Sequence, residues 1–259
     1  RQKLPFLREE LVSSKRQLTV ERSYVGEQFT IDKVQGVGVE YDSDMFRVAV
    51  MINDGLTSGD GGTSVNAFTQ KDNFDAQENS PSEDRPTNKD FNDDATDFAI
   101  TARIDVKLAG NWKQWNDFTG WEGEEFAAFI GGAIHYEIGE TGDGYLNNNF
   151  LSWTLDGSVE LAGLNFFTAI MGMHPDLDSA SAGSEYDIFG VVVQLGFHVI
   201  PNKLEPFARF EWVDFDGAIT DNTSNTDDEV AMITGGINWY FKKHTKFTLD
   251  VIYAFDEVP

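Results

Sequence analysis

Hydrophobic and polar residues alternate along much of the chain, in segments of roughly ten residues. In the clearest segment, 150–161, Leu151, Trp153 and Leu155 alternate with polar residues. Successive side chains of a β-strand point to opposite faces of the sheet, so this pattern predicts a strand with one apolar and one polar face. A similar alternation, of varying regularity, recurs at 1–7, 34–41, 45–53, 98–108, 124–138, 164–174, 189–199, 204–213, 229–241 and 246–255.

Short and long connections alternate between the predicted strands. Short links lie at 42–44, 162–163, 201–203 and 242–244, and a link of medium length at 109–123 counts as short. Long connections lie at 8–33, 54–94, 139–148, 175–184 and 214–228. With about eleven strands, this order predicts an all-β, antiparallel up-and-down meander with long loops at one end, the topology of a transmembrane β-barrel. We expect a single barrel domain over 1–259, with 54–94 as a long acidic extracellular loop.

The apolar faces of these strands are long and unbroken, with five or six residues each. A tilted strand needs about 9–11 residues to cross a hydrocarbon layer, so the predicted strands are long enough. Aromatic residues gather near the strand ends, as in the girdles at both membrane interfaces. They are Tyr41, Trp112, Trp115, Trp121, Tyr136, Trp153, Trp212, Trp239, Tyr240 and Tyr253. We therefore expect the apolar faces to contact lipid; the alternative is a soluble sheet that buries them.

Several short motifs accompany the alternation: 3–6 (KLPF), 8–10 (REE), 13–14 (SS), 21–23 (ERS), 204–211 (LEPFARFE), 236–241 (GINWYF) and 243–244 (KH). Together they resemble the phosphate-selective porin O and P family of Gram-negative outer membranes. The resemblance covers essentially the whole chain and implies a sixteen-stranded barrel that assembles as a homotrimer and passes anions. With about eleven strands, the chain is expected to be a partial barrel, incomplete at both ends.

The polar faces of the strands carry the candidate pore-lining residues. These are Arg47, Arg103, Asp105, Lys107, Glu137, Asp156, Glu160, Arg209, Glu211, Lys246 and Asp250. Charges of both signs in a lumen create a field that orients permeating ions, although cross-strand pairing that only stabilises the sheet would use the same residues. Phosphate selectivity needs a dense row of bases, and this mixed, slightly acidic set does not provide one.

One long connection, 8–33, differs from the others because bases outnumber acids in the first 33 residues by seven to five. In porins a long loop often folds inward and narrows the pore. The constriction candidates in this connection are Arg8, Lys15, Arg16, Glu21 and Arg22. The alternative is an ordinary solvated extracellular loop.

The overall charge limits the partners. The formal net charge is −25, and nucleic acid is an unsuitable partner because phosphate binding needs a basic surface. Over 54–94, acids outnumber bases by ten to three, so an acidic outer mouth and a weak cation preference are expected. The expected partners are outer-membrane lipid and lipopolysaccharide, together with small ions or solutes.

Several other chemistries lack a sequence signal. The chain has no cysteine and no run of about 18 apolar residues that would span a membrane as a helix. Its four histidines show no metal-ligand or triad spacing, and 54–60 and 221–228 do not match a helix-flanked calcium loop. We expect no catalytic residues, no metal and no cofactor.

The sequence thus favours a porin of the cell outer membrane, a passive diffusion channel for small hydrophilic solutes and ions. A second hypothesis is a secreted or surface β-sandwich that binds carbohydrate or protein. A third is a barrel that serves for anchoring or adhesion, with 54–94 as its contact loop.

Overall fold

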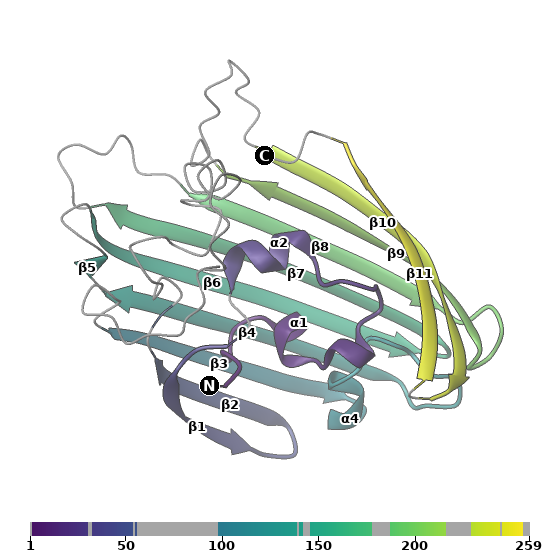
Figure 1. Cartoon of the computed structure of the whole chain (residues 1–259). Coiled ribbons are helices and arrows are strands. Elements are labelled where there is room, and N and C mark those ends of the chain that lie inside the picture. The colour runs from purple at the N-terminus through teal and green to yellow at the C-terminus, as the bar shows by residue number, and fades with distance from the viewer. Residues whose placement is uncertain are drawn as a thin grey trace.

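The computed structural model describes residues 2–30, 33–53, 55, 98–138, 140–141, 146–177, 187–215, 229–243 and 245–255. One antiparallel sheet dominates this part of the chain (Figure 1). Its strands are β1 (Gly36–Asp42), β2 (Phe46–Asn53), β3 (Phe98–Ala109), β4 (Ala127–Ile138), β5 (Glu140–Thr141), β6 (Leu146–Leu161), β7 (Leu164–Leu177), β8 (Ile188–Phe197), β9 (Leu204–Asp214), β10 (Glu229–Lys242) and β11 (Thr245–Ala254). The helices are α1 (Arg8–Leu11), the 3₁₀ turn η1 (Ser14–Arg16), α2 (Tyr24–Phe29) and α4 (Trp112–Trp115).

Neighbours in the sheet follow the order of the chain, β1-β2-β3-β4-β6-β7-β8-β9-β10-β11, and the short β5 pairs with β6. The predicted all-β, antiparallel up-and-down meander is therefore confirmed. Among the described residues, the edge strands β1 and β11 each have a partner on one side only, so the sheet is open. The predicted loop 54–94 lies outside the described residues except for Gly55.

The first predicted strand, 1–7, was wrong. In its place the structure has an isolated bridge between Gln2 and Val34, followed by irregular chain that leads into α1. Pro5 has no N–H to contribute to a ladder, and its neighbours Leu4 and Phe6 are buried against the sheet instead of forming part of it.

The connection between β6 and β7 shows how tightly the meander turns at its short end. Leu161 pairs with Leu164, and the two residues between them have positive φ angles, 48° at Ala162 and 86° at Gly163. Two consecutive residues with positive φ give the type I′ geometry that matches the twist of antiparallel strands. This hairpin therefore keeps both strands in register directly up to the turn.

The two faces of the sheet have opposite environments. Large apolar side chains on one face are exposed, with exposed fractions of 49% at Ile104, 58% at Ile134 and 50% at Leu155. The alternate residues on the same strands, such as Thr101 and Asp156, are buried. The apolar face is thus uncovered and the polar face is covered, the reverse of a soluble sheet.

The cover is the segment 2–34, which contains α1, η1 and α2 and lies across the concave face of the sheet (Figure 1). It reaches from β3, where Arg103 donates a hydrogen bond to the Phe6 carbonyl, to β11, where Asp250 accepts one from the Val20 N–H. We call it the interior segment. No helix in the described part of the chain has the length and apolar character needed to cross a membrane.

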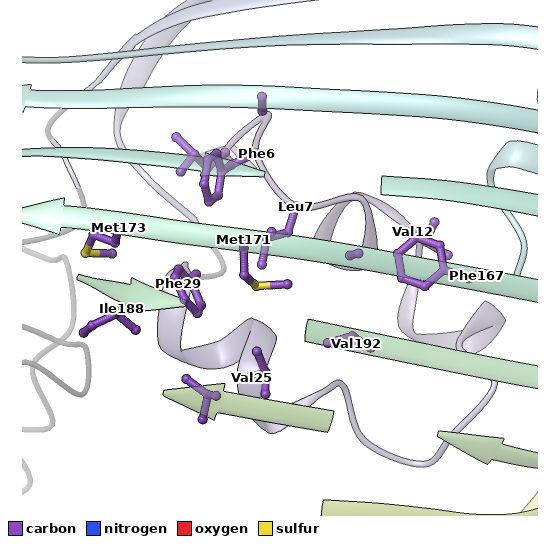
Figure 2. Packing of buried hydrophobic residues seen from close by; sticks show 14 of the residues in the cluster. Phe6, Leu7, Val12, Val25, Phe29, Phe167, Met171, Met173, Ile188 and Val192 are labelled. Atoms are coloured by element: carbon purple, nitrogen blue, oxygen red, sulfur yellow. The ribbon is translucent and has the colours of Figure 1, made fainter. Parts of the chain in front are cut away.

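A hydrophobic core joins the interior segment to the sheet (Figure 2). Val25 and Phe29 of α2 are fully buried, and they belong to the same cluster as Met171, Ile188 and Val192 on the concave face. The concave face is therefore apolar over part of β7 and β8, where the sequence predicted a polar wall. The prediction of a polar face was wrong there because one face of these strands is buried by protein and their other face is also apolar.

A second segment, 110–126, also covers the concave side. It begins with α4, whose first turn is closed by a capping box between Asn111 and Gln114. Trp115 and Trp121 in this segment are buried, with 5% and 6% of their surface exposed. We call it the turn segment, because it joins β3 to β4 at the short-turn end.

The predicted girdle is consequently wrong for three of its aromatic residues. The Trp115 indole donates to the carboxylate of Asp105, and Tyr240 donates to Glu205, so both satisfy their polar atoms on the concave side. Trp121 packs edge-on against Tyr240 with ring centroids 4.7 Å apart. By contrast, Trp153 and Trp239 lie on the uncovered face, with 36% and 38% of their surface exposed.

Candidate functional site

The strand register places all eleven predicted pore-lining residues on the concave face. Most of them are covered by the interior and turn segments: Arg103, Asp105, Glu137, Asp156, Glu160, Arg209 and Glu211 are buried. The others remain half-buried: Arg47, Lys107, Lys246 and Asp250. Six of the eleven form clusters with residues of the covering segments: Arg103, Asp105, Asp156, Arg209, Glu211 and Lys246. Arg47 and Lys107 instead pair with Asp42 and Asp44.

The first cluster centres on Arg103 in β3. Its guanidinium donates to both oxygens of Asp105, with N–O distances of 3.0 and 2.6 Å, and to Asp156 on β6 at 2.7 Å. The remaining terminal nitrogen donates to the Phe6 carbonyl of the interior segment at 2.7 Å. Gly131 makes room for this network, because a Cβ there would lie 2.3 Å from Asp105 Oδ1.

The second cluster centres on Arg8 in α1, which was predicted from the sequence as a constriction residue. Only 1% of its surface is exposed. Its Nη1 donates to Ser158 Oγ at 2.5 Å, and its Nε and Nη2 donate to the Trp115 carbonyl at 3.2 and 2.9 Å. Burial lowers the pKa of Arg8 to about 10, which still leaves the side chain charged at neutral pH.

Four aromatic rings surround this buried guanidinium. Its central carbon lies 5.1–5.6 Å from the ring centroids of Trp115, Phe118, Phe129 and Phe167. A cation within about 6 Å of a ring face is attracted by the ring quadrupole, and the attraction strengthens when water is excluded. Asp156 also stabilises the charge through space. These contacts compensate a buried cation that forms no direct ion pair with any residue in the described part of the chain.

The third cluster is built on Arg209 in β9. It pairs with Glu211 at 2.7 Å and lies 3.5 Å from Glu9 of α1. It also donates to Thr19 Oγ1 at 2.7 Å and to the Glu21 carbonyl at 3.0 Å. Arg209 thus fixes the bend of the interior segment between η1 and α2.

A fourth set of contacts lies at the short-turn end. Asn238 Nδ2 donates to the Leu18 carbonyl at 2.9 Å and to Glu205 at 3.1 Å, and Lys246 donates to the Gln17 carbonyl. In three of the four clusters, polar side chains of the strands hold backbone carbonyls of the interior segment. The residues predicted to line a lumen therefore also anchor the segment that covers them.

The other constriction candidates are at least partly exposed, unlike Arg8. Lys15 and Glu21 are exposed, whereas Arg16 and Arg22 are half-exposed. Arg16 donates to the Asn116 carbonyl at 3.2 Å, and Arg22 lies 3.3 Å from Glu10. The open, exposed side of the interior segment thus carries charged side chains, most of which are basic.

Sequence reasoning missed several residues of these clusters. Glu9 and Ser158 had no distinguishing signal, since one lies in a mixed-charge stretch and the other in an ordinary alternating strand. The sequence predicted residues 109–123 only as a link between two strands. Its three tryptophans within ten residues were the available indication that it packs against something.

The described residues contain no group of three or more His, Asp or Glu side chains placed to hold a metal ion. The calcium candidates 54–60 and 221–228 lie outside the described residues except for Gly55. An open hollow of about 290 Å³ lies at the short-turn end, lined by Trp121, Glu122, Gly123, Glu124, Asn202 and Lys243. Lys243 and Glu124 pair across it at 2.5 Å.

Comparisons of the chain with protein-family models, with curated proteins and with solved structures give no match. The site is therefore interpreted from its own geometry.

Proposed function

We propose that this chain forms a β-barrel channel of a Gram-negative outer membrane, a porin for passive diffusion of small hydrophilic solutes and ions. The observation that carries the proposal is the inverted sheet, which leaves its apolar face uncovered and buries its charged face. Soluble monomers rarely expose contiguous apolar patches above a few hundred Å². Lipid is the partner that such a face fits, because strands in a membrane alternate apolar-out and polar-in.

The β-sandwich hypothesis is less well supported. It requires a second layer over the apolar face, whereas both covering segments of the described chain lie on the opposite, concave face. The membrane hypothesis has a requirement of its own. Unpaired strand edges are not tolerated in hydrocarbon, so β1 and β11 must acquire partners when the sheet inserts.

Transport in this proposal runs through the concavity beside the interior segment and needs no cofactor. The weak cation preference rests on the acidic stretch 54–94, and charges at a mouth act over about 10 Å at 0.1 M salt. The basic side chains on the open side of the interior segment favour anions. Homotrimer assembly and contact with lipopolysaccharide remain part of the proposal through the resemblance to porins.

Extraction and conductance test the proposal together. We expect release from membranes by detergent and not by high salt, and a compact band on a denaturing gel that shifts on heating. Purified protein in planar bilayers should then give discrete conductance steps. Release by salt alone, with no heat shift, would instead favour the soluble sheet.

Reversal potentials in a salt gradient test the charge preference. If the acidic mouth dominates, a cation preference appears at low salt and fades as salt screens it. An anion preference at both low and high salt would contradict the expected cation preference and assign selectivity to the interior segment.

A second candidate function is a barrel that anchors or adheres without conducting. The extensive cover on the concave face favours it, because seven of the eleven predicted pore-lining residues are buried. Absence of conductance from protein with the detergent and heat behaviour described above would select this candidate.

A further inference from the structure

The interior segment and the turn segment approach the concave face from opposite ends of the sheet. The interior segment leads into β1 at Gly36, which pairs with Asn53, the last residue of β2. The turn segment joins β3 and β4 at the short-turn end. They meet near the short-turn end, where the Phe118 N–H donates to the Arg16 carbonyl at 3.3 Å and Arg16 donates to the Asn116 carbonyl at 3.2 Å.

Arg8, in the interior segment, lies at this meeting point and contacts both the turn segment and the strands of the sheet. It belongs to the interior segment, and two of its nitrogens donate to the Trp115 carbonyl of the turn segment. Its third contact is Ser158 Oγ on β6. The surrounding rings come from the turn segment and from two strands, with Phe129 on β4 and Phe167 on β7.

We propose that Arg8 is a latch that locks the interior segment and the turn segment to each other and to the barrel wall. The other contacts between the two segments are the hydrogen bonds at Arg16, the packing of Leu11 against the Trp115 cluster, and the burial of Phe118 in the core that the interior segment forms. Among these contacts, Arg8 alone binds the turn segment and a strand of the sheet at the same time through one charged group. The latch makes the two segments one rigid body, so that the cover over the concave face has a fixed shape. Arg8 is a positioning residue in this role and does not contact the permeating solute.

An arginine suits this role better than a lysine. Its planar guanidinium donates through two nitrogens to one carbonyl while its face stacks on aromatic rings. A lysine ammonium is a compact point charge that forms neither the double contact nor the stacking. The latch therefore predicts a graded loss of rigidity between the two segments. Arg8→Lys should be intermediate between the wild type and Arg8→Met.

The test measures the distance between the two segments directly. The chain has no cysteine, so Lys15→Cys and Lys113→Cys, both at exposed positions, accept spin labels at these sites alone. Pulsed electron paramagnetic resonance of the full chain in detergent should give one narrow distance distribution. Arg8→Met should replace it with a broad one, and Arg8→Lys should give an intermediate width.

Arg47→Met is the matched control. Arg47 also stacks on an indole of the turn segment, at 4.1 Å from the Trp112 ring, but it belongs to β2 and its ion pair is with Asp42 of β1. The control should keep the narrow distribution. Circular dichroism verifies the β-content of each variant, and if Arg8→Met does not fold, the comparison of Arg8→Lys with wild type decides.

The effect of the latch on transport rests on the proposed channel function. The experiments can nevertheless contradict the latch and the channel function independently of each other. Broadening by Arg8→Met in protein that shows no conductance would support the latch and overturn the channel. In conducting protein, the latch predicts noisier current with a loss of the single conductance level. An unchanged distance distribution in folded Arg8→Met would overturn the latch whatever the current shows.

Discussion

At the residue scale, a glycine in β8 sets how closely the interior segment approaches the sheet. A Cβ at Gly190 would lie 2.5 Å from Val25 Cγ1 and 2.9 Å from Phe29 Cε2, both on α2. Glycine weakens a strand interior because it has no side chain to pack and loses more backbone entropy. Its presence on the concave face is explained by the helix that packs directly over it.

Gly190→Ala should therefore destabilise the protein. Overpacking of a filled core typically costs about 1–3 kcal/mol, and the neighbours here are fully buried. Urea unfolding followed by tryptophan fluorescence measures the change. Gly235→Ala in β10 is the control, because a Cβ there meets nothing within 4 Å and the substitution should be neutral or slightly stabilising. Equal effects of the two substitutions would contradict the docking of α2 on Gly190.

The surroundings of His198, next to the short turn after β8, predict that the free energy of unfolding depends on pH. Its ring lies 5.4 Å from Trp121 and 5.5 Å from Tyr240, and burial lowers the pKa of His198 below its usual value of about 6.5. Below pH 6.5 the unfolded chain takes up a proton that the folded chain still excludes. The stabilisation is therefore complete above pH 6.5 and is lost as the pH falls through the folded pKa.

We expect wild type to lose more unfolding free energy, or to gain less, than His198→Phe when the pH falls from 7.5 to about 5.5, because only wild type carries this histidine. Burial raises the pKa of nearby Asp117, which stabilises the fold at lower pH and acts in the opposite direction. Keeping the measurement above about pH 5.5 limits the contribution of this carboxyl group. The same pH profile in His198→Phe and wild type would show that the ring is not the responsible group.

At the element scale, alternation predicted the strands well because it reports directly on two faces of one strand. The segment predicted at 98–108 is β3, Phe98–Ala109, and the one predicted at 204–213 is β9, Leu204–Asp214. The interior and turn segments lack such a period. Their positions depend on contacts such as Arg209 to Thr19, which join residues far apart in the chain and leave no local pattern.

For the candidate site too, the part that lies on the strands was predictable and the part that lies on the covering segments was not. Strand parity put Arg103 and Arg209 on the concave face, and the register agrees. The segments that cover that face could not be predicted. The sequence pattern of a charged residue on a polar strand face is the same whether its side chain contacts water or a backbone carbonyl. The sequence therefore indicated which residues share a face but not that most of them are buried.

Arg209→Met tests how firmly the interior segment is anchored. It would leave Glu211 and Glu9 buried without their cation, and removal of one partner from a buried pair typically costs about 3–5 kcal/mol. Chemical unfolding should show this loss, and trypsin should cleave after Lys15 faster in the folded protein. The matched control, Arg47→Met, removes a half-exposed pair with Asp42 and should cost about 1 kcal/mol or less. Unchanged cleavage in Arg209→Met would mean that the core of α2 alone holds the segment.

At the scale of the whole molecule, the interior segment gives the sheet a protein core on one side and leaves the other side apolar and bare. A soluble sheet of this kind would aggregate through its exposed face. In a membrane the same face is buried in lipid, and the core formed with the interior segment keeps the charged residues away from hydrocarbon. The two sides of the sheet are thus suited to different surroundings, and this difference is measurable.

Four of the tryptophans provide that measurement. Trp153 and Trp239 are on the uncovered face, whereas Trp115 and Trp121 are buried on the concave side. In vesicles with brominated acyl chains, bromine quenches the tryptophans that contact lipid. Replacing Trp153 and Trp239 together by Phe should therefore remove much of the quenchable fluorescence, and the matched replacement of Trp115 and Trp121 should leave the quenched signal unchanged. If both double variants lose the same quenched signal, or if bromine does not quench the wild type, the uncovered face does not contact lipid. The sheet would then have to bury this face against protein.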